Sequence, residues 1–363
     1  MTHPPMDIVV LGLSITSSWG NGHATTYRAL CRQLRARGHQ ITFLERDAPW
    51  YAGNRDMPEP PFARTYLYDS IDELRRRHEA LVRDADLVIV GSYVPEGIAV
   101  GEWVTAVAGG VTAFYDIDTP VTLAKLANGG AEYVSRTLIP RYDLYLSFTG
   151  GPTLDRLERE FGARMARPLY CSVDTTDYFP DSAEPRWDLG YLGTYSDDRQ
   201  PALARLMLEP ARSLATCRFV VAGAQYPDGI AWPRNVTRII HLPPRDHRAF
   251  YNGQRYTLNI TRADMVRAGW SPSVRLFEAA ACGTPIVSDY WEGLEEFFEL
   301  GRDILIARSP SDTETYLHDV PEQERVAIGG RGRERVLARH TAAHRAAELE
   351  SYAFDALAAG AGR

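Results

Sequence analysis

The 363-residue chain has almost no lysine, few cysteines and no long hydrophobic run, and each shortage excludes a class of protein. Lys125 is the only lysine among 40 basic residues, so a lysine-based Walker loop is excluded and a phosphate would have to bind guanidinium groups, backbone amides or histidine. The closest two of the four cysteines, Cys171 and Cys217, are 46 residues apart, which indicates neither a zinc site nor a redox pair. The amino-terminal segment lacks the basic region of a signal peptide. We therefore expect a cytoplasmic protein without an integral membrane segment.

The charge balance is mildly acidic, with a net charge of −7 and a sequence pI near 5.8. A general nucleic-acid binder needs a basic surface, so we expect no nucleic-acid partner. The composition is 45% hydrophobic and 24% charged, which is typical of a globular protein, and the length indicates two to three domains. Composition leaves the oligomeric state open.

Short apolar runs alternate with longer helical stretches, a pattern typical of a parallel sheet covered by helices on both faces. A strand at 8–14 leads through a loop at 17–22 to a helix at 23–37, which Gly38 closes before a strand at 40–45. Further strands are predicted at 86–92, 111–116, 143–148 and 168–173. Together these elements predict one Rossmann-like domain.

A stretch rich in turn formers and acids, 175–188, precedes a second series of strands. These are predicted at 189–194, 219–224, 238–243, 256–261 and 284–289. The predicted fold class is therefore α/β, with two Rossmann-like, doubly wound domains facing an interdomain cleft. We expect domains at 1–180 and 181–335, followed by a packing helix at 336–363. The helical composition of this last stretch starts at about Arg331. Ligands of such sheets bind at the carboxyl ends of the strands, so function is expected in the loops there.

The loop after the first strand contains Gly20, Asn21, Gly22 and His23 and leads into a helix. A dinucleotide fingerprint is disfavoured, because Thr25 replaces its third glycine and the glycines begin six residues after the strand ends. Instead, Gly22 and the start of the helix would let a phosphate or sugar approach the backbone closely. His23 is a candidate neutral base; the alternative is a capping or packing histidine.

The most specific stretch is 269–296. A loop of Ser271, Pro272 and Ser273 leads into a predicted helix, which ends at Cys282 and Gly283. Orphan amides converge at such a helix start, so Ser271, Ser273 and Arg275 predict an anion site. One turn further on, Glu278 is placed to accept hydrogen bonds from ribose hydroxyls; the alternative is an exposed helix glutamate.

The segment from Ser271 to Asp289 resembles the donor-binding motif of the GT-B glycosyltransferases of the Glu-x7-Glu type, the family 4-like group. Within that group it is most similar to the CgeB-like spore-maturation glycosyltransferases. The resemblance covers roughly 7–310 and includes two further signatures: Gly22 to Gly38-His39, and Val173-Asp174 with Tyr178 and Pro180.

The resemblance implies roles for individual residues on the donor side. Glu278 would hold the ribose hydroxyls, and the position of the motif's first glutamate, eight residues earlier, is Trp270. Ser271, Ser273 and Arg275 would meet sugar hydroxyls and diphosphate, and Arg199 would contact the diphosphate. It further implies a nucleoside-diphosphate (NDP) sugar as co-substrate, with no cofactor and no metal.

On the acceptor side, Tyr115 replaces a histidine that would touch the sugar, and Asp116 is a candidate base or acceptor contact. The spacing of Asp116 and Asp118 resembles a metal-binding Asp-x-Asp pair, but a metal role is disfavoured because the pair follows a first-domain strand.

The sequence therefore predicts a glycosyltransferase that moves a sugar from an NDP-sugar to an acceptor hydroxyl or amine. The acceptor, a small molecule or glycan, would bind mainly on the first domain. Glu278 and the general pattern favour a retaining reaction; His23 favours an inverting one, because plant-type inverting enzymes carry a Gly-His pair there. The alternatives are a nucleotide-sugar epimerase of the same fold and a catalytically silent sugar-nucleotide-binding protein.

Overall fold

The computed structural model describes residues 4–20, 22–182 and 184–360, and it divides into two compact units. The first unit consists of Met1–Cys171 together with Ala342–Arg363, and the second is Ser172–Thr341. The main segment of the first unit thus ends at Cys171, nine residues before the predicted boundary at residue 180. It also takes in the last helix, which the sequence had set apart.

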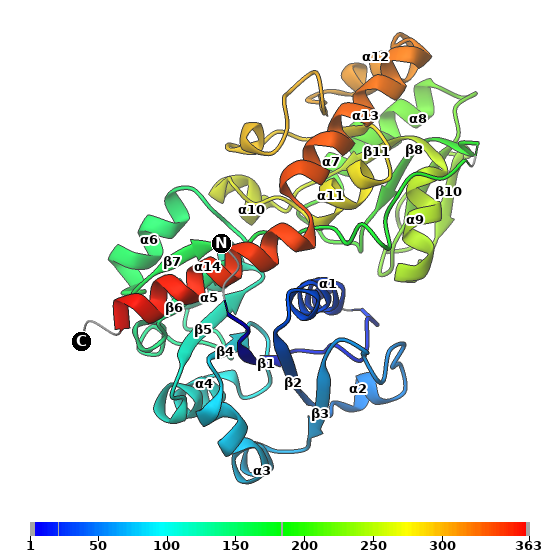
Figure 1. Ribbon diagram of the computed structural model, residues 1–363. Helices are drawn as coiled ribbons and strands as arrows, with labels where there is room; N and C mark the ends of the chain where they lie inside the picture. Colours follow the sequence, from blue (N-terminus) through cyan, green and yellow to red (C-terminus); the bar gives the residue numbers. More distant parts are fainter. Residues whose placement is uncertain (1–3, 21, 183, 361–363) are drawn as a thin grey trace. The chain divides into compact units, whose positions relative to one another are not determined.

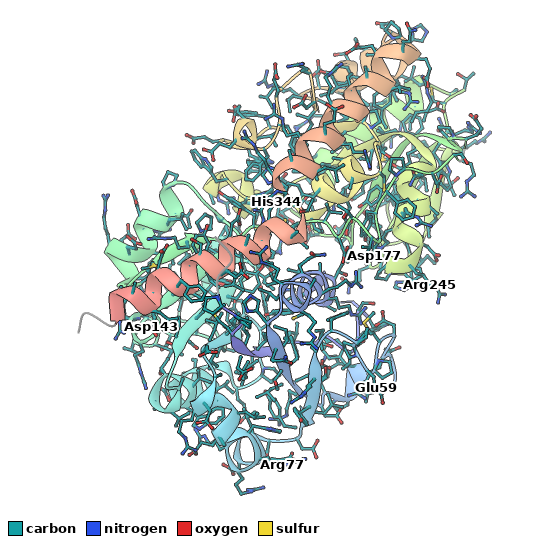
Figure 2. All side chains as sticks on the ribbon, viewed as in Figure 1. Glu59, Arg77, Asp143, Asp177, Arg245 and His344 are labelled. Carbon is teal, nitrogen blue, oxygen red and sulfur yellow. The ribbon has the colours of Figure 1, made fainter. Side chains whose placement is uncertain are left out.

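Within the described residues, the first sheet has seven parallel strands in the order β3-β2-β1-β4-β5-β6-β7 (Figure 1). The strands are β1 (Asp7–Gly12), β2 (Gln40–Arg46), β3 (Arg64–Tyr68), β4 (Leu87–Gly91), β5 (Val111–Asp116), β6 (Leu144–Ser147) and β7 (Ala166–Pro168). The sequence did not predict β3, an edge strand of half-exposed and exposed residues without an apolar run. Asp143, labelled in Figure 2, accepts hydrogen bonds from the N–H and hydroxyl of Thr112, both 2.9 Å, and thereby ties β6 to β5.

The helices of this unit cover both faces of the sheet. They are α1 (Gly22–Ala36), α2 (Pro49–Ala52), α3 (Ile71–Asp84), α4 (Gly97–Val107), α5 (Thr119–Ala127), η1 (Ile139–Arg141), α6 (Pro152–Phe161) and α14 (Ala342–Gly360). Alternate residues of a strand point to opposite faces. Ile8 and Val10 accordingly pack with α1 and α14, whereas Val9 and Leu11 pack with α3 and α4.

The C-terminal stretch forms two helices rather than the single helix predicted from Arg331. The first ends at Arg339, and α14 starts at Ala342 and packs against α1, β5 and β6. Glu350 fixes this packing, because its buried carboxylate pairs with Arg37 and lies 2.6 Å from Nε2 of the fully buried His39. None of the described helices is long and apolar enough to span a membrane.

The second sheet, over the described residues, has six parallel strands in the order β10-β9-β8-β11-β12-β13. The strands are β8 (Trp187–Leu192), β9 (Phe219–Ala222), β10 (Val236–Ile239), β11 (Gln254–Asn259), β12 (Ile286–Ser288) and β13 (Leu305–Ile306). The helices are α7 (Gln200–Leu203), η2 (Ala204–Leu208), α8 (Glu209–Ser213), α9 (Pro244–Asn252), α10 (Ala263–Ala268), α11 (Val274–Ala281), η3 (Leu294–Glu296), α12 (Pro310–His318) and α13 (Glu322–Arg339). Each of the five strands predicted for this unit overlaps an observed strand, and the two-residue edge strand β13 was not predicted.

Both sheets have the strand order of a doubly wound Rossmann fold, in which the order reverses beside the first strand. The reversal falls between β1 and β4 in the first unit and between β8 and β11 in the second. The predicted α/β class with two Rossmann-like domains is confirmed. The cleft predicted between them concerns their relative placement and stays a prediction. Ligands of such sheets bind beside the reversal, at the carboxyl ends of the strands.

Candidate functional site

A buried carboxylate organises the loop after β1. Glu45, at the end of β2, is fully buried and accepts hydrogen bonds from the N–H groups of Ile15 and Thr16 at 2.7 and 3.0 Å. The hydroxyls of Ser14 and Thr16 donate to it at 3.0 and 2.6 Å. Because these bonds occupy the carboxylate, Glu45 cannot serve as the ribose acid of a dinucleotide site.

A second carboxylate fixes the end of the same loop. Asp56 accepts a bidentate pair from Arg28 at 2.8 and 2.9 Å and two hydrogen bonds from Ser18, both 2.8 Å. Partial burial opposes ionisation, but these bonds hold the pKa of Asp56 well below its usual range. The loop is thus held in place just before α1, which begins at Gly22. A Cβ built on Gly22 would meet no atom within 4 Å, so the helix start adjoins open space. Asn21 lies outside the described residues.

His23 is the second residue of α1 and is half-buried. Its ring meets that of Tyr93 edge to face, with 5.3 Å between the centroids. Burial lowers the pKa of His23 below 6.5, and the negative charge of Asp118 partly opposes this shift. The imidazole is therefore neutral at pH 7, as a general base requires.

Asp116, the last residue of β5, serves the interior of the first unit. It is fully buried and accepts hydrogen bonds from Tyr145 at 2.5 Å, Thr122 at 2.8 Å and the N–H of Asp118 at 3.2 Å. Burial raises the pKa of Asp116 to about 6 in spite of these bonds. The catalytic role of Asp116 stays a prediction, and the contacts show a carboxylate that joins β5, α5 and β6.

Asp118 and Tyr93 are residues that sequence reasoning missed. Asp118 lies just past β5 and accepts a hydrogen bond of 3.1 Å from the Tyr93 hydroxyl. Burial raises the pKa of Tyr93, so this hydroxyl remains a donor. Tyr93 has φ = 65°, a left-handed conformation that bulky residues rarely adopt. The Asp-x-Asp spacing marked Asp118 only as a possible metal ligand, and nothing in the sequence marked Tyr93.

In the second unit, α11 has the predicted boundaries. Ser273 is its N-cap and Cys282 its C-cap, and Gly283 follows with φ = 73°. The side chains of Ser273 and Arg275 both donate to Oδ1 of Asn259 at the end of β11, at 2.8 and 2.7 Å. Asn259 therefore positions two predicted anion ligands. Sequence reasoning missed it, although a polar residue ending a buried apolar strand was the available signal.

Arg275 spans the point where the strand order reverses. Its Nε donates to the carbonyl of Leu192, the last residue of β8, at 2.6 Å, while its Nη1 reaches β11. The other predicted serine, Ser271, is buried and donates to the carbonyl of Gly269 at 2.8 Å. The guanidinium is thus held beside the carboxyl ends of both central strands.

Three guanidinium groups gather at this edge: Arg199, Arg262 and Arg275, called the arginine cluster below. Burial lowers the pKa of Arg199; Tyr191 opposes this shift, and the positive charges of Arg275 and Arg262 add to it. Arg199 donates to the carbonyl of Thr194 at 2.6 Å. The buried Nε of Arg262 has no hydrogen-bond partner among the described residues. Asp198 faces Arg199 and Arg262, and Asp289 faces Arg275, so carboxylates offset part of this charge. The spare donor of Arg262 still suits an anion.

Glu278, one turn beyond Arg275, is only 4% exposed, so the alternative of an exposed helix glutamate is wrong. Its carboxylate accepts a hydrogen bond of 3.0 Å from Tyr251, and Tyr178 is also bonded to it. Burial, and then the charge of Glu278, raise the pKa of both tyrosines, which stay protonated donors. The ribose role of Glu278 stays a prediction.

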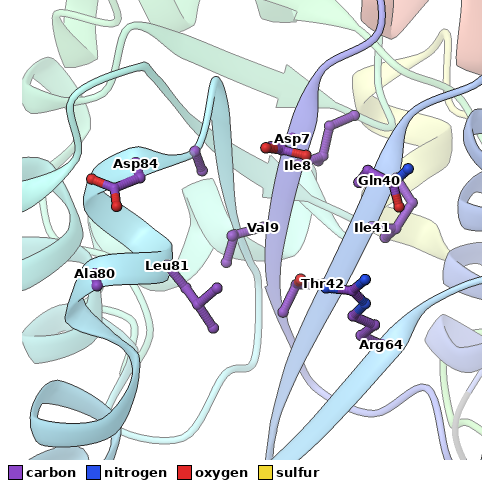
Figure 3. Close-up of a pocket in the computed structure, with 11 residues that line it drawn as sticks. Asp7, Ile8, Val9, Gln40, Ile41, Thr42, Arg64, Ala80, Leu81 and Asp84 are labelled. Atoms are coloured by element: carbon purple, nitrogen blue, oxygen red, sulfur yellow. The ribbon is translucent and has the colours of Figure 1, made fainter.

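A cavity of about 330 Å³ lies at the amino-terminal ends of β1, β2 and β3, away from the carboxyl ends where the predicted site residues lie (Figure 3). Its lining includes Asp7 and Gln40, the first residues of β1 and β2, and Arg64 of β3. None of the predicted site residues lines it. Among the residues that the structure describes, no group of three or more His, Cys, Asp or Glu side chains forms a metal site.

One family model matches part of the chain. Residues 199–351 match the family model of glycosyl transferase-like proteins, which covers less than half of the chain but includes the whole arginine cluster and Glu278. A search of curated proteins found no match.

Solved structures share the fold over nearly the whole chain. Sucrose-phosphate synthase of Thermosynechococcus elongatus is 14% identical, with a TM-score of 0.68, and the match covers 97% of this chain and 100% of the other. HepE of Anabaena, in complex with UDP and glucose, is 13% identical with a TM-score of 0.66, and 95% and 98% are covered. An alpha-glucosyltransferase in complex with UDP-glucose and DNA is 13% identical with a TM-score of 0.72, and 97% and 100% are covered.

The chain therefore has the fold of these solved structures, and part of its second unit matches the glycosyl transferase-like family model.

Proposed function

We propose that the protein transfers a sugar from an NDP-sugar to the hydroxyl or amine of a small molecule or glycan in the cytoplasm, without a metal or cofactor. The observation that carries the proposal is the arginine cluster beside β8 and β11, with the unpartnered Nε of Arg262. We place the chain in the Glu-x7-Glu group, near the CgeB-like enzymes, on the resemblance of 271–289.

The donor diphosphate would bind at the arginine cluster and the start of α11. Breaking the bond from sugar to diphosphate builds negative charge on the leaving group, and preorganised cations and amides stabilise that charge. Arg275 is preorganised by its bonds to Leu192 and Asn259. The UDP seen in the HepE and alpha-glucosyltransferase structures supports a nucleoside diphosphate here.

The ribose would bind at Glu278. Residues three apart on a helix are neighbours, so Glu278 follows Arg275 on one face of α11. Tyr251 and Tyr178 orient the carboxylate, which retains acceptor sites for vicinal hydroxyls. This order along the helix matches that of ribose and diphosphate in the donor.

The acceptor would bind at the carboxyl edge of the first sheet, beside Gly22 and His23. Asp118 stabilises the imidazolium that forms when His23 takes a proton, and Tyr93 holds Asp118. With a net charge of −7, the chain is a poor match for a nucleic-acid acceptor.

For the stereochemical course we propose retention, with the departing phosphate as base, on the resemblance of the donor motif. Inversion is the second candidate, and a specific observation favours it: the neutral His23 beside Asp118 is a base ready to activate the acceptor. The anomeric configuration of the product, read by NMR, decides between the two.

A thermal-shift screen of UDP, GDP, dTDP and ADP and their glucose conjugates tests the proposal. We expect one nucleotide to raise the melting temperature of the wild type and not of Arg275→Ala, and its sugar to be transferred to an acceptor. Donor epimerisation without transfer would support the epimerase instead, and binding without transfer or hydrolysis would support the silent binder. Absence of binding by all eight compounds would contradict the proposal.

A further inference from the structure

Two of the seven tryptophans differ from the others in exposure. Trp19, in the loop between β1 and α1, exposes 51% of its surface, and Trp50, in α2, exposes 54%. The other five, which all lie in the described part of the chain, are buried or half-buried. Single exposed apolar residues are ordinary, whereas large apolar side chains that gather at one place mark a binding surface.

A chain of hydrogen bonds joins the backbone at the two tryptophans. Because β1 and β2 are parallel neighbours, the loop after β1 and the helix after β2 lie at the same edge of the first sheet, at the carboxyl ends of the strands. There the N–H of Trp19 donates to Oγ of Ser17 at 3.3 Å, and this hydroxyl donates to the carbonyl of Asn54 at 2.7 Å. Nδ2 of Asn54 in turn donates to the carbonyl of Trp50 at 3.0 Å. Trp19 and Trp50, called the tryptophan pair below, are therefore fixed to one hydrogen-bonded rim.

Both indoles have an open ring face. Among the described residues, the side chain of Trp19 makes no ring, cation–π or hydrogen-bond contact. Trp50 has one ring contact within the same part of the chain, to the buried Tyr51, with 5.9 Å between the centroids and 63° between the planes. An edge contact of this kind covers at most one face of the indole. Since more than half of each residue is accessible, each ring has a face free to stack on a ligand.

The surroundings of the tryptophan pair suit a neutral ligand. The nearby arginines are neutralised, because Arg28 pairs with Asp56 and Arg55 pairs with Asp47. Glu59, labelled in Figure 2, is exposed in the loop between α2 and β3 and adds a negative charge. This charge balance disfavours nucleic acid and anionic lipid, both of which bind basic surfaces.

We propose that the tryptophan pair binds the acceptor and that this acceptor is an uncharged oligosaccharide, an inference that rests on the proposed function. The C–H face of a sugar stacks on the negative face of one indole, and the second indole holds a second sugar unit. Asn54, exposed at the middle of the hydrogen-bond chain, accepts a sugar hydroxyl at Oδ1, which has no partner among the described residues. His23 follows Trp19 by four residues, which span at most about 14 Å, so the end of the oligosaccharide reaches the proposed acceptor site.

An array of uncharged oligosaccharides of one to four units, built from glucose, galactose, mannose and N-acetylglucosamine, supplies the probes. Calorimetry on the whole chain then measures the Kd for the tetrasaccharide that binds best and for its monosaccharide. We expect the wild type to bind the tetrasaccharide about tenfold more tightly, and Trp19→Ala and Trp50→Ala each to weaken that binding about three- to tenfold. Trp19→Phe and Trp50→Phe keep the stacking and should lose less.

Leu81→Ala is the matched control, because Leu81 is exposed on α3 of the same unit but lines the cavity at the amino-terminal ends of the strands. It should leave the tetrasaccharide Kd unchanged, and every variant should bind the nucleoside diphosphate like the wild type.

If no oligosaccharide binds, or if both alanine variants bind the tetrasaccharide like the wild type, the inference is overturned while the proposed function stands. Binding to vesicles of phosphatidylcholine and phosphatidylglycerol that both alanine variants lose would assign a membrane contact and overturn it too. Oligosaccharide binding by a chain that binds none of the nucleotides would support the glycan-binding surface and contradict the proposed function.

Discussion

The two units share one strand order but place differently charged side chains at the carboxyl ends of their strands. At the reversal point of the first sheet lie a neutral histidine, His23, and the carboxylate of Asp118. At the corresponding point of the second lies the arginine cluster, with a guanidinium donor that has no partner among the described residues. The difference teaches that the doubly wound sheet determines where a site lies, and the residues that follow the strands determine what it binds.

The units also differ in how they hold their site. In the first, Glu45 and Asp56 bind the backbone of the loop that leads to α1, so the position of the helix start is fixed. In the second, Asn259 binds the side chains of Ser273 and Arg275 directly. We therefore expect changes in the second unit to act on donor binding and changes in the first to act on catalysis.

The largest effect is expected from Arg275→Ala. It removes a preorganised cation from the leaving group and one donor each from the Leu192 carbonyl and Asn259, so kcat/KM for transfer should fall about 100- to 1,000-fold. Steady-state kinetics measures this. Arg267→Ala removes an exposed arginine on α10 that pairs with Asp264 and should have little effect. Equal activity in the two variants would contradict the assignment of the diphosphate site.

His23→Ala is expected to have the next largest effect. If the course is inverting and His23 is the general base, its loss should lower kcat about 100-fold, while the Kd for the nucleoside diphosphate stays at its wild-type value. Kinetics and calorimetry on the same variant separate the two effects. If kcat were retained, His23 would be a packing residue. The first unit would then have no demonstrated base to set against the arginine cluster of the second.

Asp118→Asn tests the electrostatic partner of His23. Burial lowers the pKa of His23 and the Asp118 charge raises it, so removing that charge should lower the pKa further. If His23 is the base of an inverting course, it acts when deprotonated and activity is lost as pH falls through this pKa. The acidic limb of the kcat/KM profile should then move to lower pH in Asp118→Asn. A limb that stays in place or moves to higher pH would contradict the pairing.

Asp116→Asn should affect stability more than activity. The pKa of Asp116 is raised to about 6, so its contribution to stability is fully present below the unfolded value of 3.8 and is lost as pH rises through about 6. From pH 4 to pH 7 the wild type should lose about 2 kcal/mol relative to Asp116→Asn in urea unfolding. We expect kcat within threefold of wild type; a fall of 100-fold would instead support the predicted catalytic role of Asp116.

Sequence patterns predicted most of the fold because buried parallel strands are continuous apolar runs and α11 has clear start and stop residues. They missed β3, where an edge strand needs no apolar run, and the break before α14, where the helical composition continues. The site was only partly predictable. Glu278 and Arg275 stand in a recognisable motif. Asp118, Asn259 and Arg262 matter through neighbours 16 to 95 residues away in sequence, which no linear pattern displays.

The most direct test of the central claim is the calorimetric binding of the nucleoside diphosphate to Arg275→Ala and His23→Ala side by side. If the second unit alone binds the donor nucleotide, Arg275→Ala loses measurable affinity and His23→Ala binds like the wild type. Wild-type affinity in Arg275→Ala, or lost affinity in His23→Ala, would contradict the division of donor and acceptor between the two sheets.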